Sequence, residues 1–176
     1  MTAISPELLG RAAVAFERMA FQQREKLADE LYARQPNLLA SIVVLKVYGA
    51  SLEQMEFVLN ILLVFYEAMK ASGLKWPIIS EDDQERCLKR VTGRIHFTEG
   101  LPPDLQAKAT SDAIADHPEQ ELLAFVFGTF KERGLLGIQN EAEKTMLLAA
   151  LNLAECIADT APRQPAKPRG DGSNRF

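Results

Sequence analysis

Residues 51–73 read SLEQMEFVLNILLVFYEAMKASG and predict the helix around which the rest of the chain packs. Ser51 and Gln54 have the spacing of a capping box, in which each side chain bonds a backbone N–H of the first helical turn. Gly73 suits the other end, because glycine readily adopts the left-handed conformation that often terminates a helix. The sequence therefore predicts one long helix with a defined start and a defined end.

The apolar residues of this helix cover nearly its whole circumference. Between Phe57 and Tyr66 only Asn60 is polar, and a helix that is apolar on all sides must be enclosed by protein or lipid. The apolar run is about half of the roughly 20 residues that span a bilayer, and charged residues flank it. We therefore expect burial in protein, without a membrane, against other helices of the chain, a second copy or another protein.

Capping residues, prolines and glycines divide the rest of the chain into further helices. We expect a single all-α globular domain of six to seven helices over residues 1–160. The expected segments are one long helix from Pro6 to Arg34 that allows a break near Phe21, a short buried helix over 36–48, a linker over 74–79, and helices over 81–97, 104–115, 119–133 and 141–159.

The order helix, proline, buried helix, glycine, capped helix occurs twice in the chain. It runs through Pro36 and Gly49 in the first half and through Pro118 and Gly134 in the second. An internal duplication of a three-helix unit is one interpretation of this pattern. Chance is the other, because helical proteins reuse such punctuation.

Composition and charge suggest a compartment and describe the C-terminal segment. The two cysteines, Cys87 and Cys156, form no C-x-x-C pair, and the first residues lack the pattern of a signal peptide, so we expect a reducing, cytoplasmic setting. Residues 161–176 are rich in proline and glycine and carry a net charge of +3, whereas the body before them carries −7. We expect this tail to be disordered, since it has too little apolar surface to fold.

Catalytic and metal-binding patterns are not found in the sequence. The two histidines, His96 and His117, have no glutamate three residues before them, so the Glu-x-x-His pairs of helical di-iron proteins are missing. No nucleophile elbow and no phosphate-binding glycine loop occurs either. We expect a protein that is not an enzyme and that needs no metal or cofactor.

Basic residues recur every four positions on the helix predicted over 81–97. Arg86, Arg90 and Arg94 share one face, which can hold phosphate groups, an acidic partner or a nucleic-acid backbone. The alternative, which we favour, is that Arg90 and Arg94 pair with carboxylates of neighbouring helices. An acidic body also argues against nucleic acid as the main partner.

Two further sets of residues are candidates for binding a ligand or a partner. Phe57, Asn60, Ile61 and Phe65 lie on the central helix and can line an apolar pocket, although Asn60 can equally fix the register of packing. Trp76 lies in the linker, where its ring either packs on the edge of the core or anchors a partner.

The leading interpretation of the sequence is a non-enzymatic interaction or regulatory protein. We expect it to associate with itself, as a homodimer or larger homo-oligomer, or with another protein, through an apolar helix face. The alternative is a helical bundle that binds an apolar small molecule. Weak association with nucleic acid, through the arginine face and the tail, is the third hypothesis and the least favoured.

Overall fold

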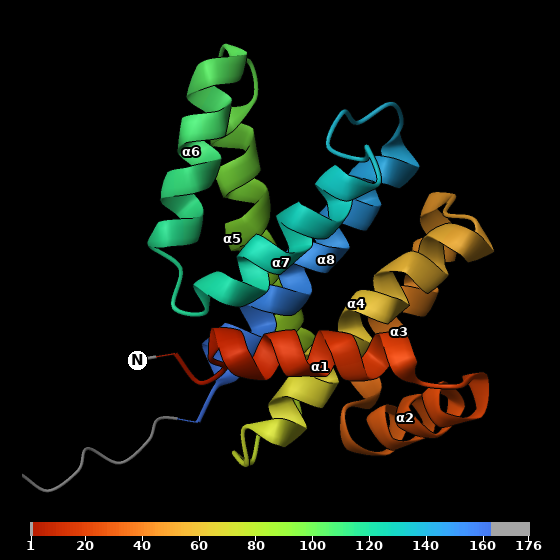
Figure 1. The fold of residues 1–176 in the computed structure, drawn as a ribbon. Coiled ribbons are helices and arrows are strands. Elements are labelled where there is room, and N and C mark those ends of the chain that lie inside the picture. The colour runs from red at the N-terminus through yellow and green to blue at the C-terminus, as the bar shows by residue number, and fades with distance from the viewer. Residues whose placement is uncertain (1, 163–176) are drawn as a thin grey trace, which may run out of the picture.

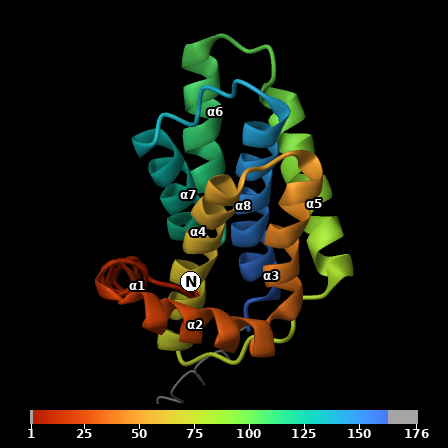
Figure 2. The same cartoon turned by 90° about the vertical axis from the view of Figure 1, so that its right-hand side faces the viewer.

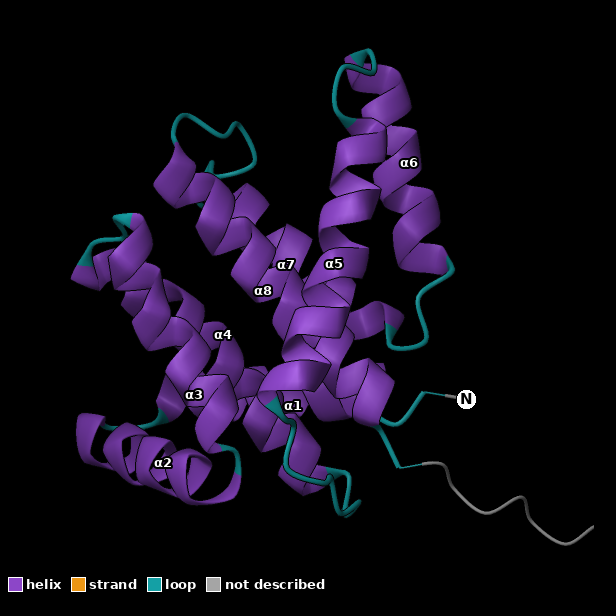
Figure 3. Cartoon of the chain, turned by 180° about the vertical axis from the view of Figure 1, so that it is seen from behind, coloured by secondary structure: helices purple, strands orange, loops and turns teal. Residues whose placement is uncertain are grey.

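The computed structural model describes residues 2–162, and this part of the chain contains eight α-helices, one 3-10 helix and no strand (Figures 1 and 3). The prediction of an all-α fold is confirmed. The elements are α1 (Pro6–Arg18), α2 (Phe21–Arg34), α3 (Pro36–Val43), η1 (Val44–Tyr48), α4 (Leu52–Ala71), α5 (Glu81–Thr98), α6 (Pro103–Ala115), α7 (Gln120–Glu132) and α8 (Glu141–Thr160). Most of the predicted tail, residues 163–176, lies outside the described residues.

Helix α4 is the centre of the core, as its sequence predicts. The Ser51 hydroxyl accepts the Gln54 amide at 3.1 Å, and the Gln54 side chain accepts the Ser51 amide at 2.9 Å, so both halves of the capping box are present. The helix ends before Gly73, which has a φ of 71°. Every residue from Ile61 to Tyr66 is buried, and α1, α2, α3 and α8 all pack against the helix. The chain's own helices therefore enclose its apolar circumference.

The predicted first helix is two helices, which raises the total above the six or seven expected. The allowed break near Phe21 falls at Met19 and Ala20, both of which have extended backbone. The Ala20 amide donates to the Gln23 side chain at 2.9 Å, and Arg24 reaches back to the Phe16 carbonyl at 3.3 Å. These local bonds hold the corner and turn α2 away from α1.

The segment over 36–48 differs from the buried helix that we expected. Leu38, Ile42 and Leu45 are buried, but Val47 is 83% exposed and Tyr48 is 60% exposed. The chain tightens into η1 and ends at Gly49 with a φ of 90°, so only one side of this segment faces the core. Its apolar composition was therefore misleading about burial.

Three antiparallel helix pairs spread from a shared base, with α1 crossing in front of them (Figure 1). The pairs are α3 with α4, α5 with α6, and α7 with α8. Figure 2 shows α3 and α4 side by side, joined at their upper ends through η1. The most extensive contacts join α5 to α8 and α1 to α4, whereas α6 has no fully buried residue.

The linker between α4 and α5 is held to the body by buried side chains. The Gln35 amide group donates to the Pro77 carbonyl at 2.7 Å and accepts the Ile79 amide at 2.9 Å. The Trp76 indole N–H donates to the Ile157 carbonyl at 3.1 Å. These bonds fix the start of α5 relative to α8.

The possible internal duplication stays a prediction. Gly49 and Gly134 both have positive φ, at 90° and 67°, and each precedes the helix that closes its half.

None of the described helices is long and apolar enough to cross a membrane.

Candidate functional site

The arginine face of α5 lies against acidic residues of α8. Arg86 and Arg90 both donate to Asp159, at 2.7 and 2.8 Å, one to each carboxylate oxygen. Arg90 Nε donates to Glu155 Oε1 at 3.1 Å, and Arg94 Nη1 donates to Glu155 Oε2 at 2.9 Å. The predicted pairing of Arg90 and Arg94 with carboxylates of a neighbouring helix is confirmed.

Glu155 is the buried centre of this ion network, which also includes His117. The Glu155 side chain is 8% exposed, and the His117 ring, whose side chain is 2% exposed, lies 3.0 Å from Glu155 Oε2 through its Nε2. Burial opposes ionisation of Glu155, but hydrogen bonds from His117 and Arg94 outweigh it and lower the pKa of Glu155 to about 2. The carboxylate is therefore ionised at neutral pH and already fully engaged by internal donors.

The backbone assigns the tautomer of His117. The Glu119 amide donates to His117 Nδ1 at 3.1 Å, so this nitrogen is an acceptor and the proton lies on Nε2, facing Glu155. The Glu119 carboxylate accepts the backbone amides of Ala3 and Ile4. A continuous polar chain thus joins α5, α8, the start of α7 and the residues that precede α1.

This network leaves little free positive charge on α5. Arg86 also donates to Asp83 at 2.8 Å, so three arginines face three carboxylates on α5 and α8. A nucleic-acid backbone is bound mainly by uncompensated Lys and Arg side chains. The geometry of the described residues gives no support to the nucleic-acid hypothesis at this face.

The four pocket residues predicted on α4 are split between two environments. Ile61 and Phe65 lie in the core, and the Phe65 ring packs against the Phe125 ring with centroids 5.8 Å apart. Phe57 and Asn60 are half-buried and line an open groove of about 630 Å³, into which Arg133 also projects. Of these four residues, only Phe57 and Asn60 therefore offer a surface to a partner or ligand.

Trp76 lies against the core instead of projecting from it. Its ring is half-buried, and its only polar atom is bonded to the Ile157 carbonyl. This placement agrees with the packing interpretation of the tryptophan. The exposed part of the ring lines an open groove beside Tyr66 and Lys70, so the partner-anchor alternative stays a prediction.

The sequence did not reveal a cluster of exposed apolar side chains at the tip of the α3–α4 pair. In the 3-10 geometry of η1 residues three apart share a face, so Val44 and Val47 lie on one side of it, and Val43 and Tyr48 flank them. All four are exposed, and Leu52, at the start of α4, is 77% exposed. We call these five residues the hairpin tip. The signal that could have found it is the spacing of the buried residues Leu38, Ile42 and Leu45, which leaves the opposite side uncovered.

Metal-binding groups do not converge in the described part of the chain. No three His, Cys, Asp or Glu side chains of residues 2–162 are arranged to hold a metal ion. Cys87 and Cys156 are both buried on the α5–α8 interface, and burial raises the pKa of each thiol. Buried thiols of this kind are poor nucleophiles.

Comparisons with protein-family models, with curated proteins and with solved structures give no match for this chain.

Proposed function

We propose that this protein is a non-enzymatic interaction protein that forms a homodimer through the hairpin tip. The observation that carries the proposal is the exposure of five adjacent large apolar side chains on η1 and its flanks. Isolated exposed apolar residues are normal on a protein surface, but a contiguous group usually marks a contact site. Covering this group removes apolar area from water, which is the main favourable contribution to association.

The charges around the hairpin tip favour a second copy as the partner. Lys46 is exposed within the tip, and Glu53 and Glu56 are exposed just beyond it on α4. None of the three has an ion-pair partner among residues 2–162. In a two-fold symmetric interface the same surface of both copies is in contact. Lys46 of each copy can therefore face Glu53 and Glu56 of the other copy.

The adjoining groove extends this surface. Phe57 and Asn60 line it next to Glu53 and Glu56, and Arg133 closes its far side. Five side chains are few for a stable interface, which typically buries about 800 Å² on each partner, so we expect weak dimerisation or a contact that extends into the groove. A contact between two copies that extends beyond the hairpin tip would continue into this groove.

The test is sedimentation velocity of the full chain over a range of concentrations. We expect concentration-dependent dimerisation, which Val47→Glu abolishes because it buries a charge in an apolar contact. Ile78→Glu is the matched control, since Ile78 is 61% exposed and lies outside the tip. A monomer at all concentrations, or a Val47→Glu variant that dimerises like the wild type, would contradict the proposal.

A further inference from the structure

A second surface feature, separate from the hairpin tip, is a cleft between the α5–α6 pair and the α7–α8 pair. Its volume is about 820 Å³, within the usual size range of small-molecule sites. Apolar side chains from all four helices dominate its walls. Its lining includes Ile95 and Thr98 of α5, Thr110 of α6, Phe127 of α7, and Leu147 and Leu151 of α8.

The cleft narrows toward the base of the fold. A deeper section of about 70 Å³ shares Ile95, Phe127 and Leu151 with the wide section and continues between Val91 and Leu123. An α-helix is about 10–12 Å wide with its side chains and cannot enter such a section. An unbranched hydrocarbon chain can pass from the wide section into the narrow one.

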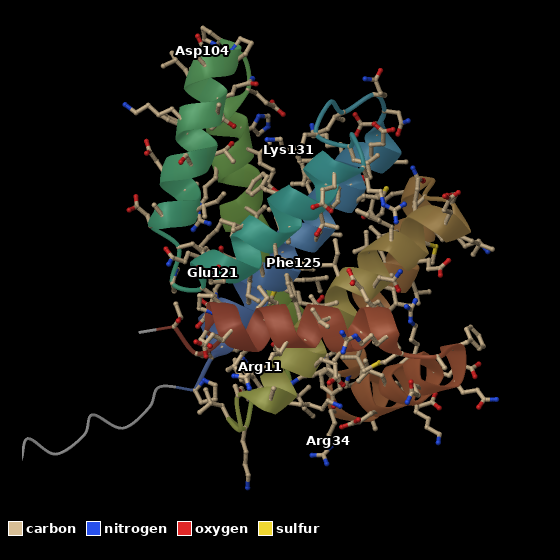
Figure 4. The ribbon with its side chains drawn as sticks, viewed as in Figure 1. Arg11, Arg34, Asp104, Glu121, Phe125 and Lys131 are labelled. Carbon is tan, nitrogen blue, oxygen red and sulfur yellow. The ribbon has the colours of Figure 1, made fainter. Side chains whose placement is uncertain are left out.

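The positive charge without an ion-pair partner lies at the wide end, whereas the narrow section is lined by Arg94 together with its partner Glu155. Lys131, in the last turn of α7, and Lys144, in the first turn of α8, line the wide section but not the narrow one. Figure 4 shows Lys131 at the upper end of α7, toward the α5–α6 pair. Lys144 is 3.5 Å from Glu99, which also contacts His96, while Lys131 has no carboxylate within ion-pair distance among the described residues. One positive charge is thus left without a partner.

Helix α6 forms the outer wall of the cleft. It has no fully buried residue, and the side chains that it presents to the cleft include the small ones of Ala107, Ala109 and Ala113. Segments with little buried apolar contact open at low free-energy cost. The wall can therefore separate to admit a chain and close over it.

The geometry points to a binding site for a single-chain amphipathic anion, of which a long-chain carboxylate is the simplest member. The hydrocarbon chain lies along the apolar walls into the narrow section, and the carboxylate lies at the wide end beside Lys131 and Lys144. The site is independent of the proposed dimer contact, since it shares no residue with the hairpin tip.

The first measurement is titration of the full chain with palmitate, hexadecanol and hexadecylamine, below their aggregation concentrations, followed by native mass spectrometry. We expect one palmitate per chain. Hexadecanol has the same chain without the charge and should bind about tenfold more weakly, since one charge-assisted hydrogen bond is worth about 1.5 kcal/mol or more. Hexadecylamine, with the wrong charge for Lys131, should bind more weakly still.

Two pairs of variants separate the chain-binding and head-binding parts of the site. Thr110→Trp fills the cleft from α6 and should abolish binding of palmitate and hexadecanol alike, whereas Ser111→Trp, exposed and outside the lining, should leave both intact. Lys131→Glu should weaken palmitate about tenfold and leave hexadecanol unchanged. Lys108→Glu, on the exposed side of α6, is its control.

Three results would overturn the inference. One is the absence of bound palmitate in the wild type. Another is a Thr110→Trp variant that binds palmitate as tightly as Ser111→Trp, which would place the ligand elsewhere. The last is equal affinity for palmitate and hexadecanol with no effect of Lys131→Glu, which would remove the anion from the proposal. A wild type that ignores palmitate but binds an acidic amphipathic peptide would replace the lipid-like ligand by a partner helix.

Discussion

Replacing Glu155 with glutamine should destabilise the protein by roughly 3 kcal/mol at pH 7. The ordinary pKa of a glutamate is 4.5 and that of Glu155 in the native protein is about 2. Each unit of pKa difference corresponds to about 1.4 kcal/mol, which gives the free energy above. The amide removes the charge that Arg90, Arg94 and His117 all face. Removing one member of a buried ion pair typically costs about 3–5 kcal/mol, which agrees with this figure.

The same substitution should change how stability depends on acidity. Between about pH 4.5 and 2 the unfolded chain binds a proton at Glu155 and the native chain does not, so acid favours unfolding. The contribution of Glu155 is complete above the unfolded pKa and is lost as the pH falls toward the native pKa. Glu155→Gln should therefore lose stability less steeply than the wild type between pH 5 and 3. The slope that remains comes from groups such as Asp159, whose pKa is lowered by hydrogen bonding to Arg86 and Arg90.

Urea denaturation at several pH values, followed by circular dichroism, measures both effects. Glu85→Gln is the matched control, because Glu85 makes an exposed 3.0 Å pair with Lys89 and surface pairs contribute about 1 kcal/mol at most. A Glu155→Gln variant as stable as this control at pH 7, or one that keeps the full acid dependence of the wild type, would refute the reasoning.

Three further perturbations test other parts of the structure. Glu119→Gln should cost about 1–3 kcal/mol, because one of two buried backbone amides loses its acceptor, and hydrogen exchange at Ala3 and Ile4 should speed up; unchanged exchange would contradict the contact. Ser51→Ala should cost about 1 kcal/mol in urea denaturation by removing the cap of α4, and no loss would argue against the capping box. Iodoacetamide should label Cys87 and Cys156 far more slowly in the native protein than in urea, as read by mass spectrometry; equal rates would show that the α5–α8 interface is open.

The features that could be predicted from the sequence are those set by local chemistry. Ser51 and Gln54 lie three residues apart and determine the start of α4, and Gly73 lies just beyond its end, so both boundaries follow from local sequence. The apolar run from Ile61 to Tyr66 also leaves no exposed side to that part of α4. The pairing of Arg90 and Arg94 could be anticipated because an acidic chain has many carboxylates to offer.

The features that could not be predicted depend on the direction in which helices leave one another. Glu155 is an ordinary acidic residue in the sequence, and only the packing of α8 on α5 buries it beside His117. The exposure of Val47 and Tyr48 likewise follows from the change to 3-10 geometry at η1, since composition alone favours burial there. The cleft lined by Ile95, Phe127 and Leu151 arises because the α5–α6 pair diverges from the α7–α8 pair, and no short segment of sequence encodes that divergence.

The link between Ile4 and Glu119 also affects how the chain is made. The partner of Ile4 lies 115 residues later in the sequence, so it does not yet exist while the first helices are being synthesised. At ordinary translation rates the delay is on the order of ten seconds. Ile4, fully buried in the finished protein, remains in contact with solvent or a chaperone throughout that interval. The stage at which the second half leaves the ribosome is therefore also the stage at which the beginning of the chain becomes protected from proteases.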